Sequence, residues 1–169
     1  YYSSELSNEN YSAVYRIGKI FGIGKEDCRR LFSRFKGLPH RLQIVRRIKG
    51  VTFVNDSKGT NPDSTIWAIR NIDTPIILIA GGKDKGLDYA SLKPYLGKVK
   101  KVNLLGESAL KISSALQDSV RVEIFSSLKE ATFNAFSEAK ANDTILFSPM
   151  CSSFDMFSNY RERGIRFME

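Results

Sequence analysis

From Leu42 onward, short apolar segments with strand spacing alternate with amphipathic segments that have helical spacing. Repeated strand–helix units favour an α/β fold, a Rossmann-like, doubly wound and mostly parallel sheet with right-handed crossovers. Lys49-Gly50 predicts a tight turn, so the first two strands form one antiparallel edge hairpin. The predicted strands are Leu42–Ile48, Val51–Asn55, Pro75–Ala80, Lys101–Leu105, Val120–Phe125 and Thr144–Phe147. The predicted helices are Pro62–Arg70, Tyr89–Leu96, Ser108–Leu116, Ser127–Ala141 and Phe154–Phe167.

Two further helices are predicted before this alternation, over Tyr11–Phe21 and Lys25–Phe35. Gly22 ends the first, and Gly37 with Pro39 breaks the chain after the second. A helical pair of this size is too small to be a domain. We therefore expect these two helices to be a fragment of a longer protein.

The charge balance is basic, with 26 Lys and Arg against 18 Asp and Glu, a formal net charge of +8 over 169 residues. The basic residues are scattered, and the densest cluster, Lys98–Lys101, has no interleaved aromatics that could stack on bases. This favours a solvated face over a nucleic-acid patch, so no nucleic-acid partner is expected. A basic site for a small anionic ligand fits the charge equally well.

Cysteine and histidine usage limits the metal chemistry. The chain has two cysteines, Cys28 and Cys151, in no C-x-x-C pattern, and a lone histidine, His40. This excludes a His/Cys zinc site built from this chain, and no metal ligand is predicted. The longest apolar run, Ile76–Ala80, is too short to span a bilayer, and the polar residues 1–10 do not read as a signal peptide. A cytoplasmic protein with reduced thiols and no membrane contact is expected.

In open parallel sheets, ligands bind beyond the carboxyl ends of the strands, so the loops after strands are the candidate sites. The first such loop, residues 55–61, places Asp56 and Lys58 before a helix N-terminus that Asn61 caps. Asp56 could accept hydrogen bonds from ribose hydroxyls, and Lys58 could meet a phosphate. Turn capping by Asp56 and a solvated Lys58 explain this loop equally well.

Two further loops extend the candidate site. Residues 81–86 are glycine-rich with two lysines but match neither a Walker A loop nor G-x-G-x-x-G, so alone they favour a hydrated loop over anion binding. In residues 148–153, Ser152 or Ser153 is expected to cap the final helix. Cys151 has no neighbouring base, which argues against a catalytic thiol. Together with residues 55–61, these loops are expected to face one crevice.

Four motifs in this order resemble the C-terminal part of the Mur ligases. The motifs are Gly37-Leu38-Pro39-His40-Arg41, residues 55–61, residues 81–86, and residues 148–155 with Asn159-Tyr160 and Arg163-Gly164. The Asp-Ser-Lys-x-Thr-Asn sequence at residues 56–61 is similar to that of the D-glutamate-adding branch. The resemblance implies that residues 1–37 are the last helices of a central ATP-binding domain and that residues 38–169 are the C-terminal domain.

The resemblance also implies a reaction in peptidoglycan synthesis. ATP phosphorylates the L-alanine carboxylate of UDP-N-acetylmuramoyl-L-alanine, and the amine of D-glutamate attacks the acyl phosphate. The P-loop and the magnesium ligands would lie in the missing part of the central domain, so this fragment alone is expected to be inactive. A monomer is expected. A folylpolyglutamate synthase-like ligase and a stand-alone nucleotide-binding module are the alternatives.

The resemblance assigns roles residue by residue. It places Lys58 at the reaction centre as the catalytic residue, Asn10, His40, Arg41 and Asp56 at the nucleotide, and Thr60, Lys85, Ser153 and the backbone of Tyr160 at D-glutamate. Three positions depart from the family pattern. Leu6-Ser7 stands where His-Asn is usual, Gly59 replaces alanine and is expected to loosen its loop, and Tyr160 replaces phenylalanine.

Overall fold

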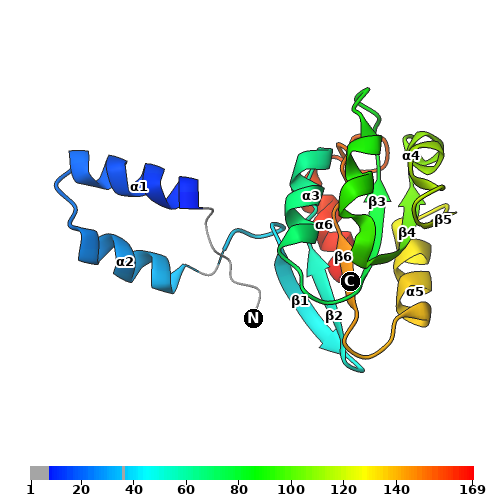
Figure 1. Ribbon diagram of the computed structural model, residues 1–169, viewed down its shortest axis with the longest axis horizontal. Coiled ribbons are helices and arrows are strands. Elements are labelled where there is room, and N and C mark those ends of the chain that lie inside the picture. Colours follow the sequence, from blue (N-terminus) through cyan, green and yellow to red (C-terminus); the bar gives the residue numbers. More distant parts are fainter. Residues whose placement is uncertain (1–7, 36) are drawn as a thin grey trace. The chain divides into compact units, whose positions relative to one another are not determined.

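The computed structural model describes residues 8–35 and 37–169 (Figure 1), so Leu6-Ser7 lies outside the described residues. The chain divides between Pro39 and His40 into two compact units. The first contains α1 (Asn8–Ile20) and α2 (Lys25–Arg34), which confirms the two predicted helices. They pack closely, because a Cβ at Gly18 would lie 3.2 Å from the Cys28 sulfur.

The second unit is built on a six-stranded sheet of order β1-β2-β6-β3-β4-β5. Only β1 and β2 pair antiparallel, and every other pair is parallel, so the predicted α/β sheet with one antiparallel edge hairpin is confirmed. Lys49 and Gly50 both have positive φ, as a tight hairpin turn requires. The strands are β1 (Gln43–Ile48), β2 (Val51–Asn55), β3 (Ile76–Gly81), β4 (Val99–Leu105), β5 (Arg121–Ile124) and β6 (Thr144–Phe147).

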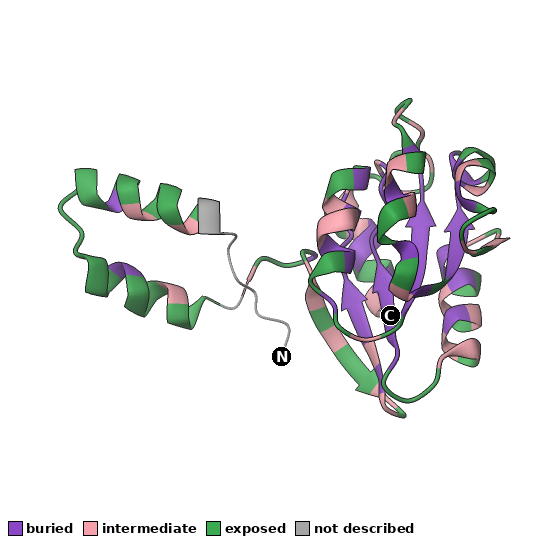
Figure 2. Cartoon of the chain, in the orientation of Figure 1, coloured by how far each residue is buried: buried purple, intermediate pink, exposed green. Residues whose placement is uncertain are grey.

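Helices cover both faces of this sheet, and its central strands are buried (Figure 2). Phe53, Ile77 and Phe147 belong to one core cluster with residues of α5 and α6. The alternate residues Leu78 and Leu146 are also fully buried, as expected for a sheet covered on both sides. The helices are α3 (Pro62–Arg70), the 3₁₀ segment η1 (Tyr89–Lys98), α4 (Ala109–Leu116), α5 (Leu128–Glu138) and α6 (Tyr160–Met168).

The predicted start of the last helix is wrong. Helix α6 begins at Tyr160 rather than near Phe154, and its cap is Asn159, whose side chain accepts hydrogen bonds from the amides of Arg161 and Glu162. Ser152 and Ser153 therefore do not cap it. The backbone before the helix is used elsewhere, since the Ser152 carbonyl accepts a hydrogen bond from the Lys83 amide.

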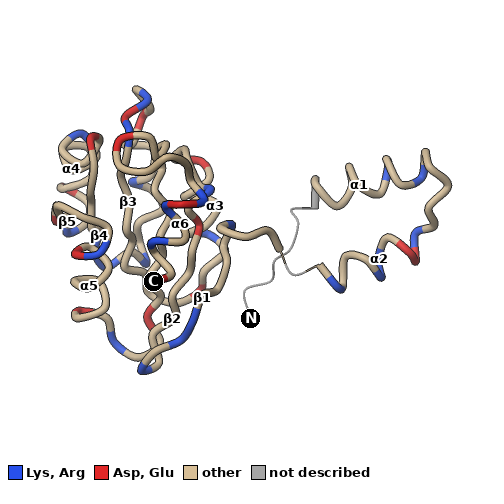
Figure 3. Tube along the Cα trace, turned by 180° about the vertical axis from the view of Figure 1, so that it is seen from behind, with Lys and Arg blue, Asp and Glu red and all other residues tan. Residues whose placement is uncertain are grey.

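The interpretation of Lys98–Lys101 as a solvated face is also wrong in part. Basic residues are spread over the sheet unit (Figure 3), but Lys101 is only 2% exposed. Its ammonium group contacts the carboxylates of Glu123 and Glu138. Lys101 belongs to β4, and its ammonium group donates a hydrogen bond to the side chain of Asn134 on α5, which explains its burial.

Among the residues that the structure describes, no helix has the length and apolar character needed to cross a bilayer.

Candidate functional site

The loops that follow β2, β3 and β6 meet at the carboxyl edge of the sheet, as predicted. Backbone hydrogen bonds connect them directly, so their positions depend on one another. They run from Met150 N to Gly59 O at 3.0 Å, from Gly81 N to Pro149 O at 2.8 Å and from Lys83 N to Ser152 O at 3.0 Å. Main-chain hydrogen bonds thus hold the three loops against one another.

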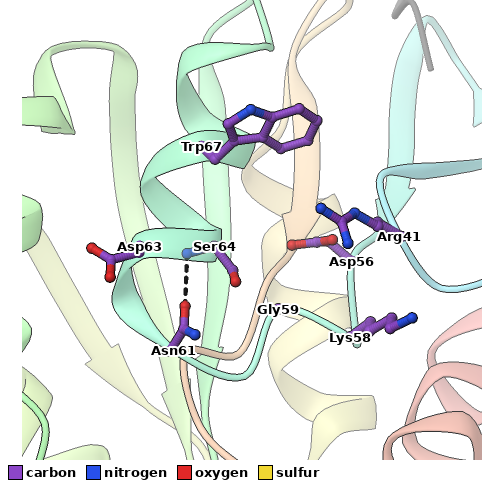
Figure 4. Close-up of a pocket in the computed structure, with 8 residues that line it drawn as sticks. All are labelled: Arg41, Asp56, Lys58, Gly59, Asn61, Asp63, Ser64 and Trp67. Atoms are coloured by element: carbon purple, nitrogen blue, oxygen red, sulfur yellow. Dashed lines mark hydrogen bonds between the residues drawn. The ribbon is translucent and has the colours of Figure 1, made fainter. Parts of the chain in front are cut away.

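A pocket of about 250 Å³ opens beside the first of these loops (Figure 4). The N-terminus of α3 forms one wall, where the Asn61 side chain caps the helix by accepting a 2.8 Å hydrogen bond from Ser64 N. Free amides and the helix dipole make such an end favourable for an anion. The lining residues are Arg41, Asp56, Lys58, Gly59, Asn61, Asp63, Ser64 and Trp67.

Two basic side chains of this pocket, those of Arg41 and Lys58, have no polar side-chain partner in the described part of the chain. Within the described residues, neither the Arg41 guanidinium nor the Lys58 ammonium makes a hydrogen bond or an ion pair. The Arg41 guanidinium instead lies 5.9 Å from the ring centroid of Trp67. Paired with a helix N-terminus, the two cations provide donors for a phosphate or a carboxylate.

Asp56 is held from two sides at the back of the pocket. Its carboxylate accepts hydrogen bonds from the Ser148 hydroxyl at 2.7 Å and from the Leu42 amide at 3.2 Å. The Ser148 hydroxyl is also 2.7 Å from that of Thr65 on α3. Burial raises the pKa of Asp56 to about 6, against the lowering effects of Ser148, Leu42 and the Arg41 charge. The unfilled lone pairs of this carboxylate are those that could accept from a ligand hydroxyl.

Gly59 leaves room for the Asp56 carboxylate and the Ser148 hydroxyl, and the looser loop expected from this glycine stays a prediction. A Cβ at this position would lie 2.4 Å from a carboxylate oxygen of Asp56 and 2.8 Å from the Ser148 hydroxyl. The missing side chain therefore allows Asp56 and Ser148 to pack against the loop backbone.

His40 is placed away from the pocket lining. It is buried, and its Nδ1 lies 3.0 Å from the Asn55 side-chain nitrogen. A Cβ at Gly164 would lie 2.3 Å from the same Nδ1, so only glycine on α6 leaves room for the imidazole. Burial, with a smaller effect of Arg161, lowers the pKa of His40. The nucleotide role of His40 stays a prediction, and the contacts seen here connect β2 to α6.

The residues predicted for D-glutamate come together in part. The Lys85 ammonium donates a 2.6 Å hydrogen bond to the Thr60 carbonyl, which joins the second loop to the first. The Tyr160 carbonyl accepts from the Ser57 hydroxyl at 2.8 Å. Ser153 is buried in the turn before α6, one residue after Ser152, which pairs with Lys83. Asn10 belongs to α1, in the other unit of the chain.

Sequence reasoning missed Arg163 as a component of the site. This side chain of α6 is 1% exposed and donates to the backbone carbonyls of Ser57 and Cys151. The only available signal was the Arg163-Gly164 pair within the resemblance, and an arginine on an amphipathic helix is ordinarily exposed.

The Cys151 thiol is buried and lies 3.2 Å from the Tyr89 hydroxyl. Burial raises the pKa of Cys151, which disfavours the thiolate.

The fold and this loop cluster define an α/β domain with a polar pocket at the carboxyl ends of its strands. Residues 40–151 match the family described as Mur ligase, glutamate ligase domain. The chain belongs to this family, as its C-terminal domain. The match begins at His40, where the structure also divides the chain.

Relatives of this chain carry a more specific name. It is 43% identical over 169 residues to UDP-N-acetylmuramoylalanine–D-glutamate ligase of Thermoanaerobacter sp. strain X514. That alignment covers 97% of this chain and 37% of the relative, so the chain spans just over a third of the curated relative's length.

Solved structures show the same fold at low identity. UDP-N-acetylmuramate-alanine ligase of Thermotoga maritima has a TM-score of 0.70 at 15% identity, over 94% of this chain and 36% of that one. E. coli FolC in complex with ADP has a TM-score of 0.70 at 20% identity, over 95% and 39%. The fold alone therefore does not separate Mur ligases from this relative.

Proposed function

We propose that this chain is the C-terminal domain of an ATP-dependent ligase that adds D-glutamate to UDP-N-acetylmuramoyl-L-alanine in the bacterial cytoplasm. The observation that carries the proposal is the pair of basic residues Arg41 and Lys58 beside the N-terminus of α3, whose charged groups make no hydrogen bond or ion pair within the described residues. The 43% identity to a D-glutamate-adding relative supports the choice of substrate. ATP would supply the phosphate that activates the L-alanine carboxylate.

The residues of this domain would act by positioning and charge stabilisation. Arg41 would face the phosphates and Asp56 the ribose, while Lys58 would offset the negative charge that develops at the reaction centre. D-Glutamate brings two carboxylates, for which Lys85, Thr60, Ser153 and the backbone near Tyr160 are suitable partners. We assign no magnesium ligand to this chain and expect those ligands, with the P-loop, in the part of the protein that precedes it.

The alternative enzyme is a folylpolyglutamate synthase-like ligase. The TM-score to E. coli FolC equals that to the Thermotoga maritima Mur ligase, 0.70, so the fold does not distinguish the two enzymes. The sequence identity does favour one of them, because it is 20% to FolC and 43% to the D-glutamate-adding relative. The Asp56–Asn61 loop also favours the D-glutamate-adding branch. A stand-alone nucleotide-binding module would use the same pocket without an amino-acid substrate.

Calorimetric titration of the 169-residue chain with ATP, with D-glutamate and with both tests the proposal. Binding of D-glutamate but not of L-glutamate, alone or after ATP, would support it. Nucleotide binding without any D-glutamate effect would favour the stand-alone module. The full-length protein should couple D-glutamate to the nucleotide sugar, and the fragment should not.

A further inference from the structure

The main chain around Arg41 is fixed and strained, whereas its side chain is free of hydrogen bonds. His40 and Leu42, on either side, have φ of 62° and 41°, in the left-handed region that non-glycine residues seldom adopt. The His40 carbonyl accepts a hydrogen bond from Lys58 N, and Leu42 N donates to Asp56. Strain of this kind persists only where surrounding contacts impose it and often marks a functional site. Arg41, between these two residues, lines the pocket.

The contact that limits the freedom of the Arg41 side chain is the ring of Trp67. In Figure 4 the guanidinium lies between Trp67 and Asp56. Its carbon is 5.9 Å from the ring centroid, within the range of a cation–π interaction. Arginine stacks well on indole because its planar guanidinium is weakly hydrated.

Trp67 is placed for this contact rather than for the core. The buried residues of α3 are Pro62, Thr65, Ala68 and Ile69, whereas Trp67 is half-buried and lines the pocket. Among the described residues, no cation other than Arg41 lies within this distance of the Trp67 ring.

We propose that Trp67 is a positioning residue of the anion site: its ring holds the Arg41 guanidinium over the pocket and so raises the affinity for a phosphate-bearing ligand. The inference rests on the proposed function only for the identity of that ligand as a nucleotide. The second cation, Lys58, comes from the neighbouring loop, whose backbone is hydrogen-bonded to His40. Holding the guanidinium in place reduces the side-chain entropy that binding must otherwise remove.

A double-mutant cycle on the 169-residue chain tests this role, with pyrophosphate and ADP as probes in calorimetry. Trp67→Ala should weaken binding by about two- to fivefold, and Trp67→Phe by less, because indole is the stronger platform. In the Arg41→Ala background, Trp67→Ala should have no further effect. Equal losses in both backgrounds would overturn the proposal, because the ring would then act without Arg41.

The matched control is Phe133→Ala on α5, which removes a cation–π contact of the same kind, with Lys129 at 6.0 Å, outside the pocket. It should leave the affinity unchanged, and an equal loss there would contradict the proposal.

Trp67 is the chain's single tryptophan, so its fluorescence reports on the Trp67–Arg41 pair without ligand. Arg41→Ala should change that emission. An unchanged emission would overturn the pairing, whether or not ligand binds.

The outcomes separate this inference from the proposed ligase function. Pyrophosphate or ADP binding that depends jointly on Trp67 and Arg41, without any D-glutamate effect, would sustain the inference and count against the ligase. D-Glutamate binding together with equal effects of Trp67→Ala in the wild-type and Arg41→Ala backgrounds would support the ligase function and overturn the inference. Failure of the wild-type chain to bind either probe would overturn the role of Trp67 in anion binding.

Discussion

The guanidinium group of Arg163 donates to both oxygen atoms of Ser57, to the carbonyl at 2.8 Å and to the hydroxyl at 3.1 Å. Its remaining nitrogen donates to the Cys151 carbonyl at 3.1 Å. No carboxylate lies within ion-pair distance of it in the described part of the chain. Burial lowers the pKa of Arg163 to about 10, against the opposing effects of Cys151 and Asp155. One buried cation on α6 therefore fixes the loops after β2 and β6 through neutral acceptors.

Replacing this cation should destabilise the fold. Arg163→Met keeps the apolar stem but leaves the Ser57 and Cys151 carbonyls unpaired, so we expect a loss of about 2–3 kcal/mol in the free energy of unfolding. Urea denaturation at neutral pH measures it. The control is Arg166→Met on the same helix, where Arg166 pairs with Glu169 in solvent and should contribute little. Similar losses in both variants would contradict the clamping role of Arg163.

Asp56 should make the stability depend on pH. Its pKa is higher in the folded chain, at about 6, than the ordinary value of 3.8, so the folded state binds the proton more tightly. The resulting stabilisation, about 2–3 kcal/mol, is fully present below pH 3.8 and is lost as the pH rises through about 6.

Asp56→Asn keeps the shape and removes the charge, so the variant should gain stability over the wild type as the pH rises from 4 to 7. Denaturant midpoints across this range give the difference, in which the other carboxylates cancel. Asp63→Asn, an exposed residue of the same pocket, should follow the wild-type curve. A constant difference between Asp56→Asn and wild type would show that Asp56 does not titrate in this window.

Gly59→Ala should displace the Asp56 carboxylate. The new Cβ would lie 2.4 Å from it, so the Ser148–Asp56 hydrogen bond must lengthen or break, at a cost of about 1–3 kcal/mol. Gly97→Ala is the control, since no atom lies within 4 Å of a Cβ there. Thermal denaturation compares the two. The interpretation fails if Gly59→Ala is as well tolerated as Gly97→Ala.

Local patterns predicted much of this fold. Helix α3 and strand β6 have the predicted bounds, because Asn61-Pro62 is a strong helix start and β6 is a short apolar run between polar residues. The start of α6 was mispredicted because Ser152, Ser153 and Asn159 are all good N-caps. The pairing of Ser152 with Lys83, distant in sequence, and the cap at Asn159 accompany the later start.

The site was predicted as a set of loops more successfully than as a set of contacts. The carboxyl-edge rule placed Asp56, Lys58 and Lys85 near one another without any coordinates. It could not show that His40 packs on Gly164, because that contact depends on how α6 crosses β2. The Trp67–Arg41 pair was hidden for the same reason: Trp67 belongs to none of the four motifs, and its contact with Arg41 depends on how α3 lies against the residues before β1.

The last prediction distinguishes two lysines on one loop. Lys85 reaches the Thr60 carbonyl at 2.6 Å, whereas Lys83 pairs with Glu107 in solvent. Thr60 and Lys85 are among the residues proposed to hold D-glutamate, so in the full-length protein Lys85→Ala should weaken D-glutamate use by about 2 kcal/mol, the scale of a hydrogen bond to a charged group. Lys83→Ala, the matched control, should change D-glutamate use little because an exposed ion pair contributes little.

Acyl-phosphate formation should survive in both variants, since that step needs no amino acid. Michaelis constants for D-glutamate, measured beside phosphorylation of the nucleotide sugar, separate the steps. Equal effects of the two substitutions would mean that Lys85 only braces the loop against Thr60.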